Sequence, residues 1–238
     1  MAAALPQWVY DLHHGINYLG SFGIIVPTVL GRRHWVRLSP PMRAVWWYCL
    51  FWTLEAPLNL YCRKVLHQNH PLFHLDVLVE TWLLGWAYYR ALGGARNPHR
   101  WWLGGLLFTA VALAEATVFG SIWEMNVYSH TLETIGLVTL ILLYFERWIH
   151  RPRPRQQPEG LFYVSCGLII YLTGSITGYV LMPLASPLGL PAQTALGIVI
   201  DVLYLICLGL LIVGLRAELK PRARIGATTK RASTVAGR

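Results

Sequence analysis

The sequence predicts an all-α, polytopic membrane protein: a bundle of seven transmembrane helices, with the N-terminus outside and the C-terminus cytoplasmic. Of the 238 residues, 55% are hydrophobic and only 13% are charged, whereas soluble domains carry about 25% charged residues. Seven mostly apolar stretches approach the roughly 20 residues that a membrane-spanning helix needs. The connecting segments are short and basic or rich in proline. We therefore expect one helical domain over positions 1–215, with no additional soluble domain.

The first apolar stretch has no basic segment before it and no clear cleavage site after it, so we expect it to remain as a span. The last 23 positions, 216–238, are basic and rich in small and polar residues, which predicts a disordered cytoplasmic tail. The seven predicted spans are, in chain order, His14–Leu30, Met42–Tyr61, Leu72–Leu92, Trp102–Gly120, Ser129–Trp148, Leu161–Leu184 and Gln193–Leu215.

The distribution of arginine and lysine predicts the orientation of these spans. Positively charged residues accumulate in the cytoplasmic loops of membrane proteins. Of the 20 basic residues, 18 lie in alternate loops and in the tail, and only Arg63 and Lys64 lie on the opposite side. We therefore expect a multi-pass protein of the cell membrane, typically a bacterial inner membrane. Because the basic residues do not gather on one amphipathic face, the charge of +9 does not predict binding to nucleic acid.

Six carboxylic acids lie inside predicted spans, and all fall in the half of the membrane away from the cytoplasm. An ionisable group at membrane depth costs about 2.5–3.5 kcal/mol on the mildest insertion scale, so such groups mark candidate functional sites. Their common position predicts a polar pocket open towards the outer face. The acids are Glu55, Asp76, Glu80, Glu115, Glu133 and Asp201.

Helical spacing predicts which of these side chains meet. Asp76 and Glu80 are four residues apart and share one helix face, and His130 precedes Glu133 by three residues. We expect Glu80 and Glu133 to point into a common cavity that Glu55 and Asp201 also reach. The predicted ligand-binding set contains the acids and two histidines at similar depth: Glu55, His74, Asp76, Glu80, Glu115, His130, Glu133 and Asp201.

Three interpretations of this cluster stay open. Histidine and carboxylate ligands on facing helices suit zinc or iron, but there is no HExxH, paired ExxH or multi-histidine box, so we expect no metal and no cofactor. Several acids at close range also form a proton-linked or cation-binding pocket, because they cannot all ionise together. The third interpretation is structural, with neutral carboxyls that form hydrogen bonds between helices.

Four segments carry a resemblance to known proteins. They are QNHPLFHLDVLVETWLL, MNVYSHTLETIGLVTLILLYFERW, FYVSCGLIIYLTGSI and VIDVLYLICLGLLIVGL. They resemble a group of small seven-span proteins common in Bacteroidota, which look like the membrane sensor modules that precede histidine kinases. The resemblance implies a sensory or signalling role and names no ligand. Together with the acidic pocket, it leads us to expect a non-enzymatic sensor or receptor-like module that binds a small or lipidic ligand there. Its partners would be the lipid bilayer, that ligand and a cytoplasmic signalling protein. This chain departs from sensor kinases because only a short tail follows the seventh span.

A second resemblance implies an enzyme. Glu55, and Asp201 in the run IDVLY, are placed like the acids of the membrane-integral meroterpenoid cyclases. By this resemblance Glu55 and Asp201 would be the catalytic proton donors, and the aromatic side chains of Trp52, Trp82 and Tyr204 would stabilise a carbocation. Sensor, enzyme and proton-linked transporter remain alternatives, although a transporter would usually contain an internal repeat, which the sequence lacks.

The predicted topology can be tested directly. A reporter that is active only in the cytoplasm, fused after Arg238, should be active, because the side of the chain with most arginines stays in the cytoplasm. The same reporter fused before Met1 should be silent. Activity of a periplasm-specific reporter after Arg238 would contradict the orientation and the outward-facing pocket that depends on it.

Overall fold

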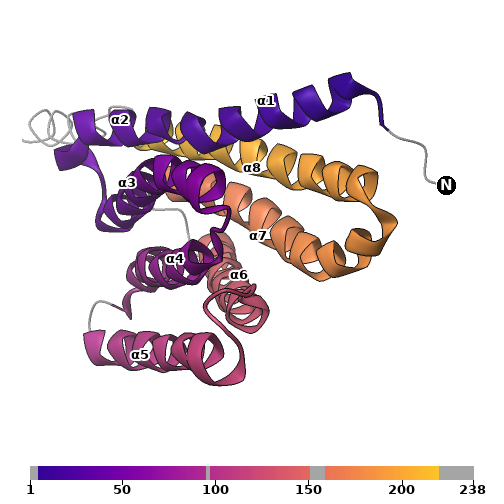
Figure 1. The fold of residues 1–238 in the computed structure, drawn as a ribbon. Coiled ribbons are helices and arrows are strands. Elements are labelled where there is room, and N and C mark those ends of the chain that lie inside the picture. Colours follow the sequence, from indigo (N-terminus) through magenta and orange to yellow (C-terminus); the bar gives the residue numbers. More distant parts are fainter. Residues whose placement is uncertain (1–4, 95–96, 151–158, 220–238) are drawn as a thin grey trace, which may run out of the picture.

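The computed structural model describes residues 5–94, 97–150 and 159–219, and within these ranges all regular structure is helical (Figure 1). This confirms the all-α prediction. Short 3-10 turns lie at Trp35–Arg37 and Ser186–Leu188, and π-helical turns at Cys62–Leu66 and Glu115–Phe119. The α-helices are α1 Gln7–Gly23, α2 Ile25–Arg33, α3 Pro40–Tyr61, α4 His70–Ala91, α5 Pro98–Ala114, α6 Val127–His150, α7 Glu159–Ala185 and α8 Leu190–Leu219.

The first predicted span is divided in the structure, and each of the other six corresponds to one helix from α3 to α8. The predicted single helix His14–Leu30 is replaced by α1, which begins earlier at Gln7, and α2, with a break at Ile24. Pro27 explains the break, because it has no N–H to donate to the carbonyl one turn earlier. Since α1 and α2 follow each other as one rod, the count of seven predicted helices agrees with the structure (Figure 1).

Two groups of helices make up the bundle. Helices α7 and α8 form the most extensive helix pair, and α1 lies along α8. On the other side α3 packs against α4, while α6 contacts both α4 and α7 and so joins the two groups (Figure 1). Helix α5 lies at the edge, where its main contacts are with α4 and α6. The space between the two groups is where a cavity can form.

Contacts between connecting segments show that the helices alternate in direction. At one end, which we call the Trp123 end, His70 Nδ1 lies 2.8 Å from the carbonyl oxygen of Trp123, where α4 and α6 begin. At the opposite end, the Glu218 end, the backbone N–H of Ser39 donates to Glu218 Oε1 at 3.2 Å, which joins the start of α3 to the end of α8. Arg147 at the end of α6 likewise donates to the carbonyl of Leu92. This alternation is the arrangement expected of a chain that crosses a membrane repeatedly.

The interior is divided along its length. The apolar core fills the half at the Glu218 end, where Tyr48, Tyr88 and Leu211 are among the side chains with no exposed surface. Buried polar side chains concentrate in the half at the Trp123 end, on the parts of the helices nearest Trp123. They include Glu55, His74, Asp76, Glu80, Glu115, Asn126, Ser129, His130, Glu133, Ser175 and Thr194.

The outer surface is apolar over long stretches. Large hydrophobic side chains such as Leu103 on α5, Ile135 on α6 and Val199 on α8 are more than half exposed. Within the described residues, three helical segments are long and apolar enough to cross a membrane: Pro98–Phe119, Gly160–Met182 and Leu190–Leu219. The helices α3, α4 and α6 carry buried acids, which lowers their mean hydropathy. The composition therefore supports association with a membrane.

Glycines bring α1 and α7 close to α8, and small residues are common at helix contacts in membrane proteins. A Cβ atom on Gly20 or Gly23 would meet Tyr204 or Leu208, and one on Gly167 would lie 3.1 Å from the Cys207 carbonyl oxygen. Gly174 and Gly178 also face α8, against Leu203 and Ile200. Gly15 is the exception, because nothing lies within 4 Å of a Cβ at that position.

Two glycines on α8 give a matched test of this packing. In Gly214→Ala the new methyl group would lie 2.6 Å from the Gly160 carbonyl oxygen, whereas nothing lies within 4 Å of one at Gly209. Overpacking against backbone costs about 1–3 kcal/mol. Gly214→Ala should therefore lower the thermal unfolding temperature in detergent, and Gly209→Ala should not. Equal unfolding temperatures for the two variants would contradict the close α7–α8 contact.

Candidate functional site

A cavity of about 700 Å³ lies between α1, α3, α4, α6, α7 and α8 in the half of the bundle at the Trp123 end. We call it the acidic cavity. No described residue of α5 lines it. Five carboxyl groups line the cavity, together with histidines, amides and aromatic rings. The polar and aromatic side chains that carry the argument below are His13, Asn17, Tyr18, Trp52, Glu55, Asn59, Arg63, Asn69, Phe73, Asp76, Glu80, His130, Glu133, Tyr171, Asp201 and Tyr204.

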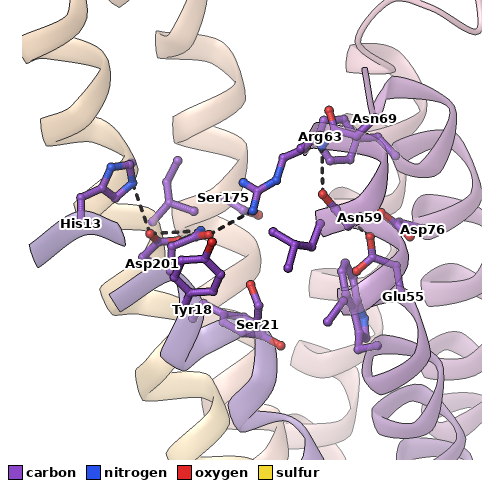
Figure 2. A pocket seen from close by; sticks show the side chains of 18 of the residues that line it. His13, Tyr18, Ser21, Glu55, Asn59, Arg63, Asn69, Asp76, Ser175 and Asp201 are labelled. Atoms are coloured by element: carbon purple, nitrogen blue, oxygen red, sulfur yellow. Dashed lines mark hydrogen bonds and ion pairs between the residues drawn. The ribbon is translucent and has the colours of Figure 1, made fainter. Parts of the chain in front are cut away.

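Glu55 on α3 is held by an amide one helical turn further along. Asn59 Nδ2 donates to Glu55 Oε1 at 2.6 Å, and Asn69 Nδ2 donates in turn to Asn59 Oδ1 at 3.1 Å (Figure 2). Glu55 is 6% exposed. The spacing of four residues places both side chains on one face of α3, and the second amide fixes the orientation of the first.

Asp201 on α8 belongs to the opposite wall (Figure 2). It accepts a hydrogen bond from Asn17 Nδ2 at 3.2 Å, and His13 Nε2 lies 3.4 Å from its other oxygen. His13 and Asn17 are four residues apart on α1, so one face of that helix supplies both partners. Arg63 reaches across from the π-helical turn after α3 and donates to Asn17 Oδ1 at 3.5 Å. Glu55 and Asp201 therefore face the same cavity from two walls.

Glu133 on α6 has two partners. Thr81 on α4 donates its hydroxyl hydrogen to Glu133 Oε1 at 3.3 Å, and His130 Nδ1 lies 3.0 Å from Oε2. Glu133 is 1% exposed. The pairing of His130 with Glu133 agrees with their spacing of three residues in the sequence, and Thr81 joins the site because α4 packs against α6.

Asp76 and Glu80 on α4 differ from the other acids on the cavity wall because one oxygen of each carboxyl group is buried without a hydrogen-bond partner. Each residue is 5% exposed, and within the described residues Asp76 Oδ1 and Glu80 Oε1 are buried without a hydrogen bond. Trp52 also lines the cavity, and its indole Nε1 is likewise buried without a hydrogen bond. Buried polar atoms in folded proteins nearly always have a partner. These three polar groups on the cavity wall therefore have hydrogen-bonding capacity that the described residues do not use, and a water molecule or another partner in the cavity would satisfy it.

Six of the eight predicted ligand-binding residues line the acidic cavity, and two do not. The structure brings together Glu55, Asp76, Glu80, His130, Glu133 and Asp201, including the expected grouping of Glu80 with Glu133. That they bind a ligand stays a prediction.

His74 and Glu115 lie outside the lining of the cavity and have structural partners. His74 Nε2 lies 3.2 Å from the Glu124 carbonyl oxygen, so it holds the segment before α6. Glu115 accepts hydrogen bonds from the backbone N–H groups of Tyr128 at 2.8 Å and Ser129 at 2.7 Å. The first N–H groups of a helix have no partner within it, and Glu115 supplies one for α6. A partner from the preceding helix, across a turn, leaves no signature at the start of α6 itself.

Of the three aromatic residues that the cyclase resemblance names, two line the cavity and one does not. Trp52 and Tyr204 line the cavity. Trp82 does not, because its Nε1 donates to Thr109 at 3.0 Å and its ring packs against Trp101 and Trp102. Its place is in the α4–α5 contact. Among the described residues, no group of three or more histidine, cysteine, aspartate or glutamate side chains is arranged to hold a metal ion.

Asn17 and Asn69 are site residues that the sequence analysis did not identify. Asn17 follows His13 by four residues in an otherwise apolar span, which is a detectable signal of a polar helix face. Asn69 lies before α4, where it lines the cavity and donates to Asn59, so its role depends on the fold.

Comparison with protein families, curated proteins and solved structures finds no significant match to this chain. The function is therefore argued from the chemistry of the cavity.

Proposed function

We propose that the protein is a seven-span receptor-like module of the cell membrane that binds a small or lipidic ligand in the acidic cavity. The observation that carries this proposal is the cavity of about 700 Å³ with buried, unpartnered polar atoms on its wall. Pockets for small ligands typically measure about 300–1,000 Å³ and combine an apolar wall with a few placed polar groups. The cavity has both features.

The distribution of charge supports an orientation with the cavity facing outwards. In the described residues, arginines such as Arg43, Arg90 and Arg147 lie towards the Glu218 end, while Arg63 and Lys64 lie at the Trp123 end. An excess of arginine marks the cytoplasmic side. The Trp123 end would then face outwards, with both ends of the chain placed as the sequence predicts. The predicted tail covers positions 216–238. Its first four positions, 216–219, are described, and the other positions lie outside the described residues.

The division of the interior suits a receptor. A ligand would lie between the group α1, α7 and α8 and the group α3, α4 and α6, where it would alter their separation at the outer end. The packed half at the Glu218 end would act as the pivot, because a close-packed core transmits displacement instead of absorbing it. A change of helix position at the cytoplasmic face would be the signal that a cytoplasmic partner detects.

Binding in the cavity can be tested with a variant that fills it. Ser21 on α1 lines the cavity (Figure 2), so Ser21→Phe should remove the space for a ligand. Thr139→Phe places the same ring on the exposed side of α6. Molecules that co-purify with the protein in native nanodiscs should include a species that falls at least tenfold in Ser21→Phe and persists in Thr139→Phe. Identical profiles by mass spectrometry for all three proteins would contradict a ligand-binding cavity.

A second candidate function is a cyclase-like enzyme within the membrane. The specific observation that favours it is that Glu55 and Asp201 face one cavity from two walls, with the rings of Trp52 and Tyr204 also on its lining. A carboxylic acid on one wall would protonate an epoxide or alkene, and the rings would stabilise the resulting cation. The other carboxylate would accept the proton that leaves at the end of the cascade.

The enzyme candidate predicts the loss of turnover in two isosteric variants. Glu55→Gln and Asp201→Asn should each abolish conversion of a prenylated epoxide, because an amide cannot act as a general acid. Glu146→Gln makes the same change on the exposed surface of α6 and should leave turnover intact. Product formation that persists in both cavity variants, followed by chromatography, would remove the cyclase candidate.

A further inference from the structure

We propose that the ligand of the acidic cavity is an apolar molecule with a protonated amine, whose ammonium group lies between Asp76 and Glu80. This inference rests on the proposed function, because it names the ligand class of the same cavity.

The unpartnered carboxyl oxygens determine where the amine would bind. Glu55, Glu133 and Asp201 already accept hydrogen bonds from Asn59, Thr81 and Asn17, whereas Asp76 Oδ1 and Glu80 Oε1 accept none within the described residues. Both residues are more than nine-tenths buried and line the cavity. Each of these two carboxyl groups therefore has the capacity to accept a hydrogen bond from a donor in the cavity.

An ammonium group has the geometry for this position. It carries three N–H donors and no acceptor, so it can donate to both carboxyls at once. Asp76 and Glu80 are four residues apart on α4, and such side chains project from one face about 5–6 Å apart at their Cβ atoms. A single hydroxyl has one donor and would leave one of the two oxygens without a partner.

The balance of charge favours a cation over a neutral or anionic ligand. Five carboxyl groups line the cavity, and Arg63 is the only arginine or lysine among its described lining residues. Arg63 donates to Asn17 on the Asp201 side. Asp76 lies within electrostatic range of Glu55, Glu80 and Glu133. These acids cannot all ionise together, so a bound cation would favour their charged forms, and a bound carboxylate would oppose them.

The remainder of the lining suits an apolar body attached to the amine. The rings of Trp52, Phe73, Tyr171 and Tyr204 line the same cavity. Aromatic faces attract ammonium groups within about 6 Å and also pack well against hydrocarbon. The volume of about 700 Å³ exceeds what an ammonium ion alone would occupy, so the ligand is an amphiphilic amine and not a small inorganic cation.

The test compares three probes of equal chain length on the full-length protein in phosphatidylcholine nanodiscs. The probes are radiolabelled dodecylamine, dodecanol and dodecanoate, with empty nanodiscs to subtract partition into lipid. The wild-type protein should bind dodecylamine at least tenfold more tightly than dodecanol, because hydrogen bonds to charged groups are the stronger ones. Dodecanoate should bind most weakly.

Isosteric variants then locate the amine. Asp76→Asn and Glu80→Gln should each weaken dodecylamine binding about tenfold and leave dodecanol binding unchanged. Glu146→Gln, an equal change on an exposed position, should bind all three probes as the wild type does. If one cavity variant does not fold, the other still decides the question. Equal affinity for dodecylamine and dodecanol in the wild type, or unchanged dodecylamine affinity in the cavity variants, would overturn the proposal.

The outcomes separate this inference from the proposed function. If the cavity binds ligands of another class, dodecanol or dodecanoate will bind above the empty nanodiscs and Ser21→Phe will abolish that binding, while Asp76→Asn and Glu80→Gln will have no selective effect on the amine. If the cavity binds no ligand, no probe will exceed the empty nanodiscs and Ser21→Phe will change nothing. The first result overturns the amine alone, and the second overturns both.

Discussion

The close packing of the half at the Glu218 end is the interaction on which the rest of the structure depends. Glycines on α1 and α7 let these helices approach α8, and fully buried side chains such as Tyr48, Tyr88 and Leu211 fill the space between the two helix groups. Because this half is apolar and closely packed, it holds the two groups of helices together. The half at the Trp123 end can therefore remain open and polar without loss of the fold.

Burial of five carboxyl groups would be prohibitive if none had a partner. Hydrogen bonds reduce this cost for three of the acids, because Asn59, Asn17 and Thr81 each donate to one carboxyl group. The two carboxyls on α4 stand apart, because within the described residues Asp76 Oδ1 and Glu80 Oε1 accept no hydrogen bond. Polar contacts that complete the fold and polar atoms without a partner are thus distinguishable on the cavity walls, and the proposed ligand chemistry rests on the second kind.

The sequence predicts the parts of this protein that depend on local pattern. Apolar length gives the helices. The common depth of the acids, with the cost of a carboxyl group that faces lipid, gives the grouping of Glu80, Glu133, Glu55 and Asp201 on one cavity. It fails where the answer depends on a distant partner. Glu115 looks like another buried acid but serves the backbone of α6, and Trp82 looks like a pocket aromatic but packs against α5. Neither partner is visible from the residues beside them.

The hydrogen bond between Arg63 and Asn17 has a consequence for the timing of binding. It joins the turn after α3 to α1 and so spans the two walls of the cavity (Figure 2). A bridge that opens only while a molecule passes, and closes behind it, adds to the barrier in both directions. Such a bridge would lengthen the time that the proposed ligand stays in the cavity without changing the equilibrium constant. Residence time and affinity would then be set by different residues, at different depths.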